Sequence, residues 1–119
     1  MEQQYLIDSN PVIDFFNGKM TAGGKNFIAA IDPAISVITH IELLSNKNIP
    51  SHEWAQLLAF IQVAAIYALD SPVAEQTIIL RQQYRIKIPD AIIAATALLY
   101  GFILISRNLP ILKIYQGLM

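Results

Sequence analysis

Three acidic residues, Asp8, Glu42 and Asp90, stand where short apolar runs end or where helices are expected to begin. In an open α/β sheet, polar residues just beyond the carboxyl ends of the strands face the edge where ligands bind. Carboxylates gathered at such an edge repel one another by roughly 3 kcal/mol per pair at about 5 Å and an effective dielectric near 20. A hard divalent cation with oxygen ligands relieves that repulsion, and such an ion can activate water for phosphodiester hydrolysis.

Taken singly, each of these acids has an ordinary structural explanation. Asp8 fits a turn residue after the run Tyr5-Leu6-Ile7. Glu42 fits the second half of a capping box that begins at Thr39. Asp90, after Pro89, fits an acid in a first helical turn. The strand-end argument also leaves Asp90 apart, because we expect a helix start that precedes a parallel strand to lie at the opposite edge of the sheet.

The elements that must position these acids are expected to alternate between strands and helices. The predicted strands cover residues 5–7, 34–38, 63–69 and 102–105, with a weakly signalled fifth at 113–115. The predicted helices cover residues 11–17, 39–44, 51–61, 71–84 and 89–100, and residues 18–25 are expected to be a loop around Gly23-Gly24. The strands are continuous apolar runs, which is typical of a parallel sheet covered on both faces. The sequence therefore predicts one three-layer α/β/α domain over residues 1–119.

Helix starts follow from polar residues next to prolines. We expect Ser9 or Asn10 to cap the first helix, with Pro11 at its first position. Ser71, followed by Pro72, is expected to cap a later helix in the same way, and helix capping also explains Asp70 just before it. Asp14 is expected to be a surface charge within the first helix.

Composition narrows the class of protein. The 119 residues are 55% hydrophobic and only 14% charged, which is apolar for a soluble monomer and predicts a partner or a homodimer. There is no cysteine, the N-terminus lacks the basic region of a signal peptide, and no run of about 18 apolar residues occurs, so we expect a cytoplasmic protein without a membrane span. The net charge of −1, with eight scattered basic residues, argues by itself against nucleic-acid binding.

Four segments nevertheless resemble, in order, the motifs of PIN domains. They are Tyr5-Leu6-Ile7-Asp8-Ser9-Asn10, Ile35-Ser36-Val37-Ile38-Thr39-His40-Ile41-Glu42-Leu43-Leu44, Ile88-Pro89-Asp90-Ala91-Ile92-Ile93-Ala94-Ala95-Thr96-Ala97 and Leu104-Ile105-Ser106-Arg107-Asn108. The third segment is the most specific of the set. The compact length looks like that of VapC-type toxins from type II toxin–antitoxin pairs.

The resemblance implies a mostly parallel five-stranded sheet and RNA cleavage that depends on Mg²⁺ or Mn²⁺. It also implies a homodimer and a cognate antitoxin that blocks the site. By motif match, Asp8, Glu42 and Asp90 become the catalytic acids and metal ligands. The auxiliary positions are Ser9, Ser106 and Asn108. Arg107 stands beside them, where it can meet an RNA phosphate.

The fourth segment departs from the family pattern. PIN domains usually carry another Asp there, either where Asn108 stands or where Ile111 stands. An Asn offers an oxygen but no charge, so a second ion should bind less tightly. Two alternatives therefore stay open: a weak or inactive PIN domain that serves as a binding module, and a receiver-type signalling domain. A receiver domain needs an acidic pair at the first strand and a Lys late in the chain, and neither is well placed in this sequence.

Overall fold

The computed structural model describes residues 4–108 and 111–112, and within them four strands form one parallel sheet. The strands are β1 (Tyr5–Ile7), β2 (Ala34–Ser36), β3 (Ala65–Tyr67) and β4 (Ile103–Ile105), in the spatial order β3-β2-β1-β4. Leu6 of β1 pairs with Ala34 on one side and Leu104 on the other. The predicted parallel sheet is confirmed with four strands. The fifth candidate, 113–115, lies outside the described residues.

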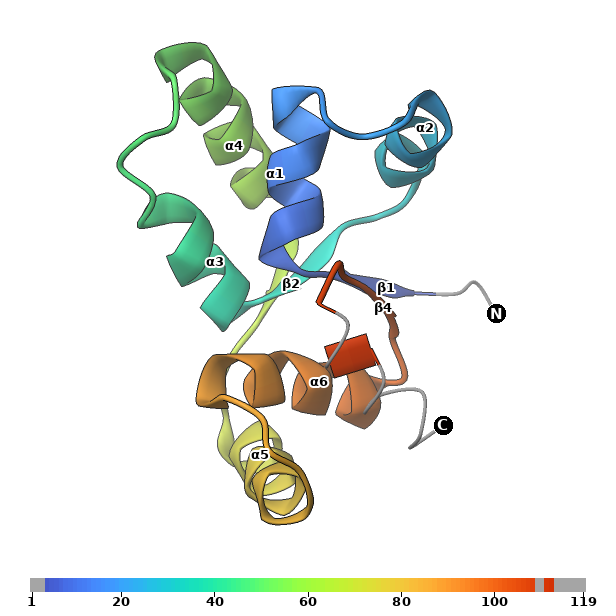
Figure 1. Ribbon diagram of the computed structural model, residues 1–119, viewed down its shortest axis with the longest axis vertical. Coiled ribbons are helices and arrows are strands. Elements are labelled where there is room, and N and C mark those ends of the chain that lie inside the picture. Colours follow the sequence, from blue (N-terminus) through green and yellow to red (C-terminus); the bar gives the residue numbers. More distant parts are fainter. Residues whose placement is uncertain (1–3, 109–110, 113–119) are drawn as a thin grey trace.

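Between residues 4 and 108, six helices cover the two faces of this sheet (Figure 1). They are α1 (Ser9–Asn17), α2 (Ala22–Ala30), α3 (Val37–Leu44), α4 (Ser51–Val63), α5 (Ser71–Gln83) and α6 (Ile88–Tyr100). The first four helices lie on one side of the strands, and α5 and α6 lie on the other (Figure 1). This arrangement confirms the predicted α/β/α layers. Among the described residues, no helix is both long and apolar enough to cross a membrane.

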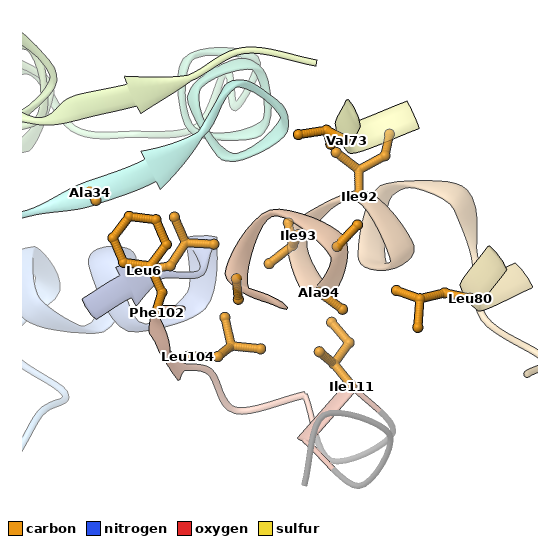
Figure 2. Packing of buried hydrophobic residues seen from close by; sticks show 12 residues of the cluster. Leu6, Ala34, Val73, Leu80, Ile92, Ile93, Ala94, Phe102, Leu104 and Ile111 are labelled. Carbon is orange, nitrogen blue, oxygen red and sulfur yellow. The ribbon is translucent and has the colours of Figure 1, made fainter. Parts of the chain in front are cut away.

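Successive side chains of β1 and β2 pack into two different cores, which is why these strand sequences are apolar on both faces. The edge strand β3 is exposed by comparison. Leu6, Ala34 and Leu104 face α5 and α6, where they join the cluster drawn in Figure 2. Ile7 and Ile35, one position further along, face the core beneath α1 to α4. A shift of one residue in either strand would exchange these faces, so the register that also positions the strand ends is strongly fixed.

A helix stands where part of a loop was predicted. α2 begins at Ala22 because the hydroxyl of Thr21 accepts a hydrogen bond of 3.1 Å from the N–H of Gly24 and caps it. Ile28 then anchors the helix in the core. The loop prediction for residues 22–25 is therefore wrong, since cap and anchor together outweigh the roughly 1 kcal/mol that each of Gly23 and Gly24 costs in a helix.

The N-cap of helix α3 is Ser36, three residues before the predicted cap Thr39. The hydroxyl of Ser36 accepts a hydrogen bond of 3.1 Å from the N–H of Ile38, so β2 ends at Ser36 and α3 starts at Val37. Thr39 consequently lies inside the helix, and the predicted capping box with Glu42 is wrong.

Aspartates, rather than the neighbouring serines, cap two further helices. Asp8 caps α1 and leaves Pro11 as its third residue, where no intrahelical acceptor awaits the missing N–H. Asp70 caps α5 through a 3.1 Å hydrogen bond from the N–H of Val73, so Ser71 is the first helical residue instead of the cap. Gly18 and Gly101, with φ of 79° and 70°, end α1 and α6 as predicted.

Candidate active site

Asp8 is held at the junction of β1 and α1 by contacts on both of its carboxylate oxygens. Its own backbone N–H donates to the carbonyl of Ile105 at 2.9 Å, which extends the β1–β4 pairing by one residue. Oδ1 accepts a hydrogen bond of 2.8 Å from the N–H of Ser9, and Oδ2 accepts one of 2.8 Å from the hydroxyl of Ser106. The side chain is only 6% exposed. These contacts leave the carboxylate one orientation, at the carboxyl end of the sheet.

Glu42 reaches the same end of the sheet from α3. Its Oε1 accepts a hydrogen bond of 2.7 Å from the hydroxyl of Ser9, while the side chain stays exposed. Ser9 therefore bonds to two acids, through its backbone N–H to Asp8 and through its hydroxyl to Glu42. The auxiliary role expected for Ser9 has this geometric basis.

Asp90 joins the group through the segment that follows β4. Its Oδ2 accepts a hydrogen bond of 3.2 Å from the amide Nδ2 of Asn108. The expectation that Asp90 would lie at the opposite edge is wrong. At its far end α6 turns directly into β4, with the N–H of Phe102 bonded to the carbonyl of Ala97. The helix thus runs antiparallel to the strand, and its start lies where the strand ends.

One chain of hydrogen bonds now connects the three predicted acids. Its members, in order, are Glu42, Ser9, Asp8, Ser106, Asn108 and Asp90. The backbone N–H of Asn108 closes one link by donating to the hydroxyl of Ser106 at 2.9 Å. The structure thus brings together every acid and auxiliary residue that the sequence singled out, except that Arg107 contacts a different partner.

The donors suit a hard divalent ion, although the acids do not converge on one point. Within the part of the chain that the structure describes, no three His, Cys, Asp or Glu side chains form a group that could hold a metal ion. Mg²⁺, however, is usually bound through one or two carboxylates and keeps several waters. The carboxylates of Asp8 and Asp90 therefore suit such an ion, whereas Asn108 presents its amide nitrogen to Asp90 and uses its oxygen on Ile111.

Comparison with known proteins identifies the fold and its family. The PIN domain family matches residues 5–115 of this chain. The chain belongs to the PIN-domain family. A toxin–antitoxin complex from Klebsiella pneumoniae contains a chain that is 34% identical, with 88% of this chain and 87% of that chain covered and a TM-score of 0.73.

More distant solved structures share the fold of this PIN domain. VapBC2 from Rickettsia felis, bound to a DNA fragment from the promoter, is 20% identical over 94% of this chain and 93% of that chain, with a TM-score of 0.76. FitAcB from Neisseria gonorrhoeae is 21% identical over 95% and 94%, with a TM-score of 0.75. A search of curated proteins found no match.

The departure in the fourth motif of this PIN domain has a structural reason at residue 111. Ile111 is fully buried and packs in the core against α6, as Figure 2 shows. A carboxylate there would be buried among apolar side chains. Asn108, in contrast, lies beside Asp90, so residue 108 is the position of the fourth motif that reaches the site.

Sequence reasoning missed the role of two residues of this PIN domain. Thr39 was assigned to a cap, yet its side chain is fully buried and its hydroxyl has no hydrogen-bond partner among the described residues. Thr77 and Thr96 satisfy their hydroxyls on carbonyls four residues earlier, at 2.8 Å. Thr39 lies one turn before Glu42 on α3, and its unsatisfied hydroxyl would gain free energy from a bound water or other polar group.

Asp14 is the second such residue. Its Oδ2 lies 2.8 Å from Nε of Arg107, and its side chain is 14% exposed against 61% for Arg107. The expectation that Asp14 is a surface charge is wrong, because the ion pair covers it. No short motif signals a contact between residues 93 positions apart, so the sequence could not reveal it.

Proposed function

We propose that this PIN domain is an endoribonuclease that uses Mg²⁺ or Mn²⁺, and that it is the VapC-type toxin of a type II toxin–antitoxin system. One observation carries the proposal. Asp8, Glu42 and Asp90 belong to a single hydrogen-bonded network at the carboxyl end of a parallel sheet. The 34% identical chain from a Klebsiella pneumoniae toxin–antitoxin complex supports the biological setting.

In this proposal the chain supplies a rigid set of oxygen ligands. A bound divalent ion would supply an activated water and stabilise the charge that builds up on the cleaved phosphate. Asp8 and Asp90 are the residues that would hold it, and Glu42, which Ser9 links to Asp8, would orient a water. Ser9 and Ser106 fix the Asp8 carboxylate but leave each of its oxygens a further lone pair for the ion.

Arg107 is the residue that would bind the RNA backbone. It is the second residue after β4 and carries an exposed guanidinium. The ion pair with Asp14 engages Nε, and a guanidinium has five N–H donors in a planar fork. The remaining donors can therefore face a phosphate, while the ion pair with Asp14 holds the side chain.

The partners we propose are an antitoxin and a second copy of the chain, in the cytoplasm. Several large apolar side chains are exposed, among them Ile41, Ile78, Ile79, Ile88 and Leu99. Burial of such side chains against another protein stabilises a complex. The names of the solved relatives describe toxin–antitoxin complexes and support the same assignment.

The test is RNA cleavage by the purified, antitoxin-free chain. We expect cleavage of a broad RNA pool with Mg²⁺ or Mn²⁺, none with a chelator, and strongly reduced cleavage by Asp90→Asn and Glu42→Gln, which keep the size of each side chain. An intact pool with both metals would remove the proposal of catalysis. Equal cleavage by the wild type and both variants would point to a contaminating nuclease.

A second function is favoured by one specific observation: a neutral Asn108 stands beside Asp90 in place of an acid. The chain would then bind its partner or RNA without cutting. Titration with Mn²⁺ in a calorimeter separates the two, because a binding module without catalysis would show no heat of ion binding at the concentrations at which the nuclease requires the ion.

A further inference from the structure

Asn108 uses both ends of its side-chain amide. Oδ1 accepts a hydrogen bond of 3.2 Å from the N–H of Ile111, and Nδ2 donates one of 3.2 Å to Oδ2 of Asp90. Its backbone is equally engaged, since its N–H donates to the Ser106 hydroxyl at 2.9 Å and its carbonyl accepts from Leu112 at 3.1 Å. Asn108 therefore links the acidic network to Ile111 and Leu112.

The direction of the amide is set by its neighbours. The backbone N–H of Ile111 can only donate, so it needs the Oδ1 of Asn108. An ionised carboxylate can only accept, so Asp90 needs the Nδ2 group. Because the two demands agree, the amide is held in one orientation, and fully buried Ile111 anchors it further.

We propose that Asn108 is a positioning residue, whose amide N–H holds the Asp90 carboxylate in place before any metal ion binds. An Asp at this position would keep the contact with the N–H of Ile111 but set two negative charges side by side. Such a site would be stable only with a shared proton or a cation. With Asn108, the site assembles from neutral donors alone. The inference rests on the proposed function only for the role of Asp90 as an ion ligand.

The test is an exchange of the two side chains, followed by thermal unfolding of the full chain in the presence of a chelator at pH 8. Asn108→Asp removes the donor but keeps the acceptor for Ile111, and we expect its midpoint temperature to fall by roughly 5 °C. Asp90→Asn leaves a hydrogen-bonded amide pair and should change the midpoint by less. The double variant N108D/D90N restores one donor and one acceptor with the polarity reversed. Its midpoint should return to within about 2 °C of the wild type.

Two results would overturn the proposal. One is an Asn108→Asp variant that is as stable as the wild type without metal. The other is a double variant that is no more stable than Asn108→Asp. If Asn108→Asp does not fold, recovery of folding in the double variant supports the proposal, and failure of both overturns it.

Mn²⁺ binding, measured by calorimetry, provides a readout that a merely structural role would not change. Asn108→Asp should bind Mn²⁺ more tightly than the wild type, since the ion then also relieves the repulsion between Asp90 and the new carboxylate. Equal or weaker binding would contradict the idea that the amide replaces a counter-charge. Neither measurement involves RNA. A chain that does not cut RNA would therefore refute the proposed nuclease activity, whereas the coupling between residues 90 and 108 would still be decided by the unfolding and Mn²⁺-binding results.

Discussion

The two ends of the same sheet differ in how they use polar residues. At the carboxyl end, side chains from the start of α1, from α3, from α6 and from the segment after β4 form hydrogen bonds with one another. At the amino end, a hollow of about 440 Å³ lies among Gln4, Asp32, Tyr67 and other residues. There the backbone makes the connections, from Ile103 to Gln4 and from Ala65 to Pro33.

The difference teaches that strand direction, rather than the size of a hollow, determines where the acidic network lies in this molecule. Another hollow, of about 470 Å³, lies along α5 and α6 and is lined mostly by apolar side chains such as Leu69, Ile78 and Ile88. Neither hollow is lined by Asp8, Glu42 or Asp90. Asp8 and Asp90 instead lie where α1 and α6 begin, and the N-termini of helices favour negative charge. Glu42 reaches the same network from the last turn of α3.

The largest expected effect is on RNA cleavage, and it appears when an acid at the carboxyl end of the sheet is neutralised and compared with an acid at the amino end. Asp8→Asn should lower the rate of RNA cleavage by about 10²-fold or more, because it removes charge at the point where the ion would bind. Asp32→Asn makes the same chemical change at the amino end and should leave the rate unchanged. The measurement is single-turnover cleavage with saturating Mn²⁺. Comparable losses in both variants would erase the distinction between the two ends.

Thermal unfolding provides the control for Asp8→Asn. Asn is nearly as good a helix cap as Asp, so the start of α1 should survive the change. A variant that unfolds at a much lower temperature than Asp32→Asn would show that the loss of cleavage is a loss of structure.

The sequence was sufficient for the layers of the fold, for a physical reason. The central strands β1 and β2 are short and apolar on both faces because they contribute to two cores, and Leu6 and Ile7 illustrate this division. Where prediction failed, one hydrogen bond decided the outcome. The hydroxyl of Thr21 started α2 despite two glycines, and the hydroxyl of Ser36 ended β2 early. Propensity is a weak prior, and a cap of about 1 kcal/mol can move an element boundary by several residues.

The sequence predicted which residues form the site, but it predicted less well which of them contact one another. Asp8 and Glu42 follow from the strand-end rule, whereas Asp90 was grouped with them by resemblance alone. A correct account of helix direction would have placed Asp90 there too, because α6 runs antiparallel to β4. The contact of Arg107 with Asp14 spans 93 residues and depends on the packing of α1 against the sheet, which no local pattern encodes.

A smaller effect is expected from breaking the middle of the network. Ser106→Ala leaves the Oδ2 of buried Asp8 and the N–H of Asn108 without their shared partner. We expect a loss of roughly 1–3 kcal/mol in the free energy of unfolding and a 10- to 100-fold weaker affinity for Mn²⁺. Denaturant titration and calorimetry measure the two quantities.

Ser45→Ala is the matched control for Ser106→Ala. Its exposed hydroxyl donates to the carbonyl of Ile41 at 2.6 Å, at the end of α3 that is remote from β2. The control should lower stability by less and leave Mn²⁺ affinity unchanged. If Ser45→Ala weakened Mn²⁺ binding as much as Ser106→Ala, the network would be irrelevant to the ion.

A smaller effect, on RNA binding, is expected from a substitution of Arg107. Arg107→Gln should weaken RNA binding and reduce the slope of log affinity against log salt concentration by about one, since one phosphate contact disappears. Lys47→Gln, beyond the far end of α3, removes the same charge and should leave the slope unchanged. Filter binding of the catalytically impaired Asp90→Asn background at several salt concentrations measures both. Equal slopes for the two variants would exclude Arg107 as a specific contact.

The smallest expected effect belongs to Tyr100, whose ring lies 4.8 Å from Tyr67, one of the residues that line the amino-end hollow. Desolvation first, and the negative charge of Asp70 second, raise the pKa of the Tyr100 hydroxyl above its ordinary value. The folded state therefore holds this proton more tightly than the unfolded state does. The resulting stability is fully present below about pH 10, the ordinary tyrosine pKa, and is lost as the pH rises through the raised pKa.

Tyr100→Phe removes this dependence, so the wild type should lose more stability than the variant between pH 9 and pH 11. Denaturant midpoints across that range measure the difference, with Tyr84→Phe, at the other end of α5 from Asp70, as the control. RNA cleavage at neutral pH should be the same in Tyr100→Phe and the wild type. A fall in cleavage would mean that the aromatic cluster of Tyr67 and Tyr100 communicates with the acidic network, and the functional separation of the two ends of the sheet would no longer hold.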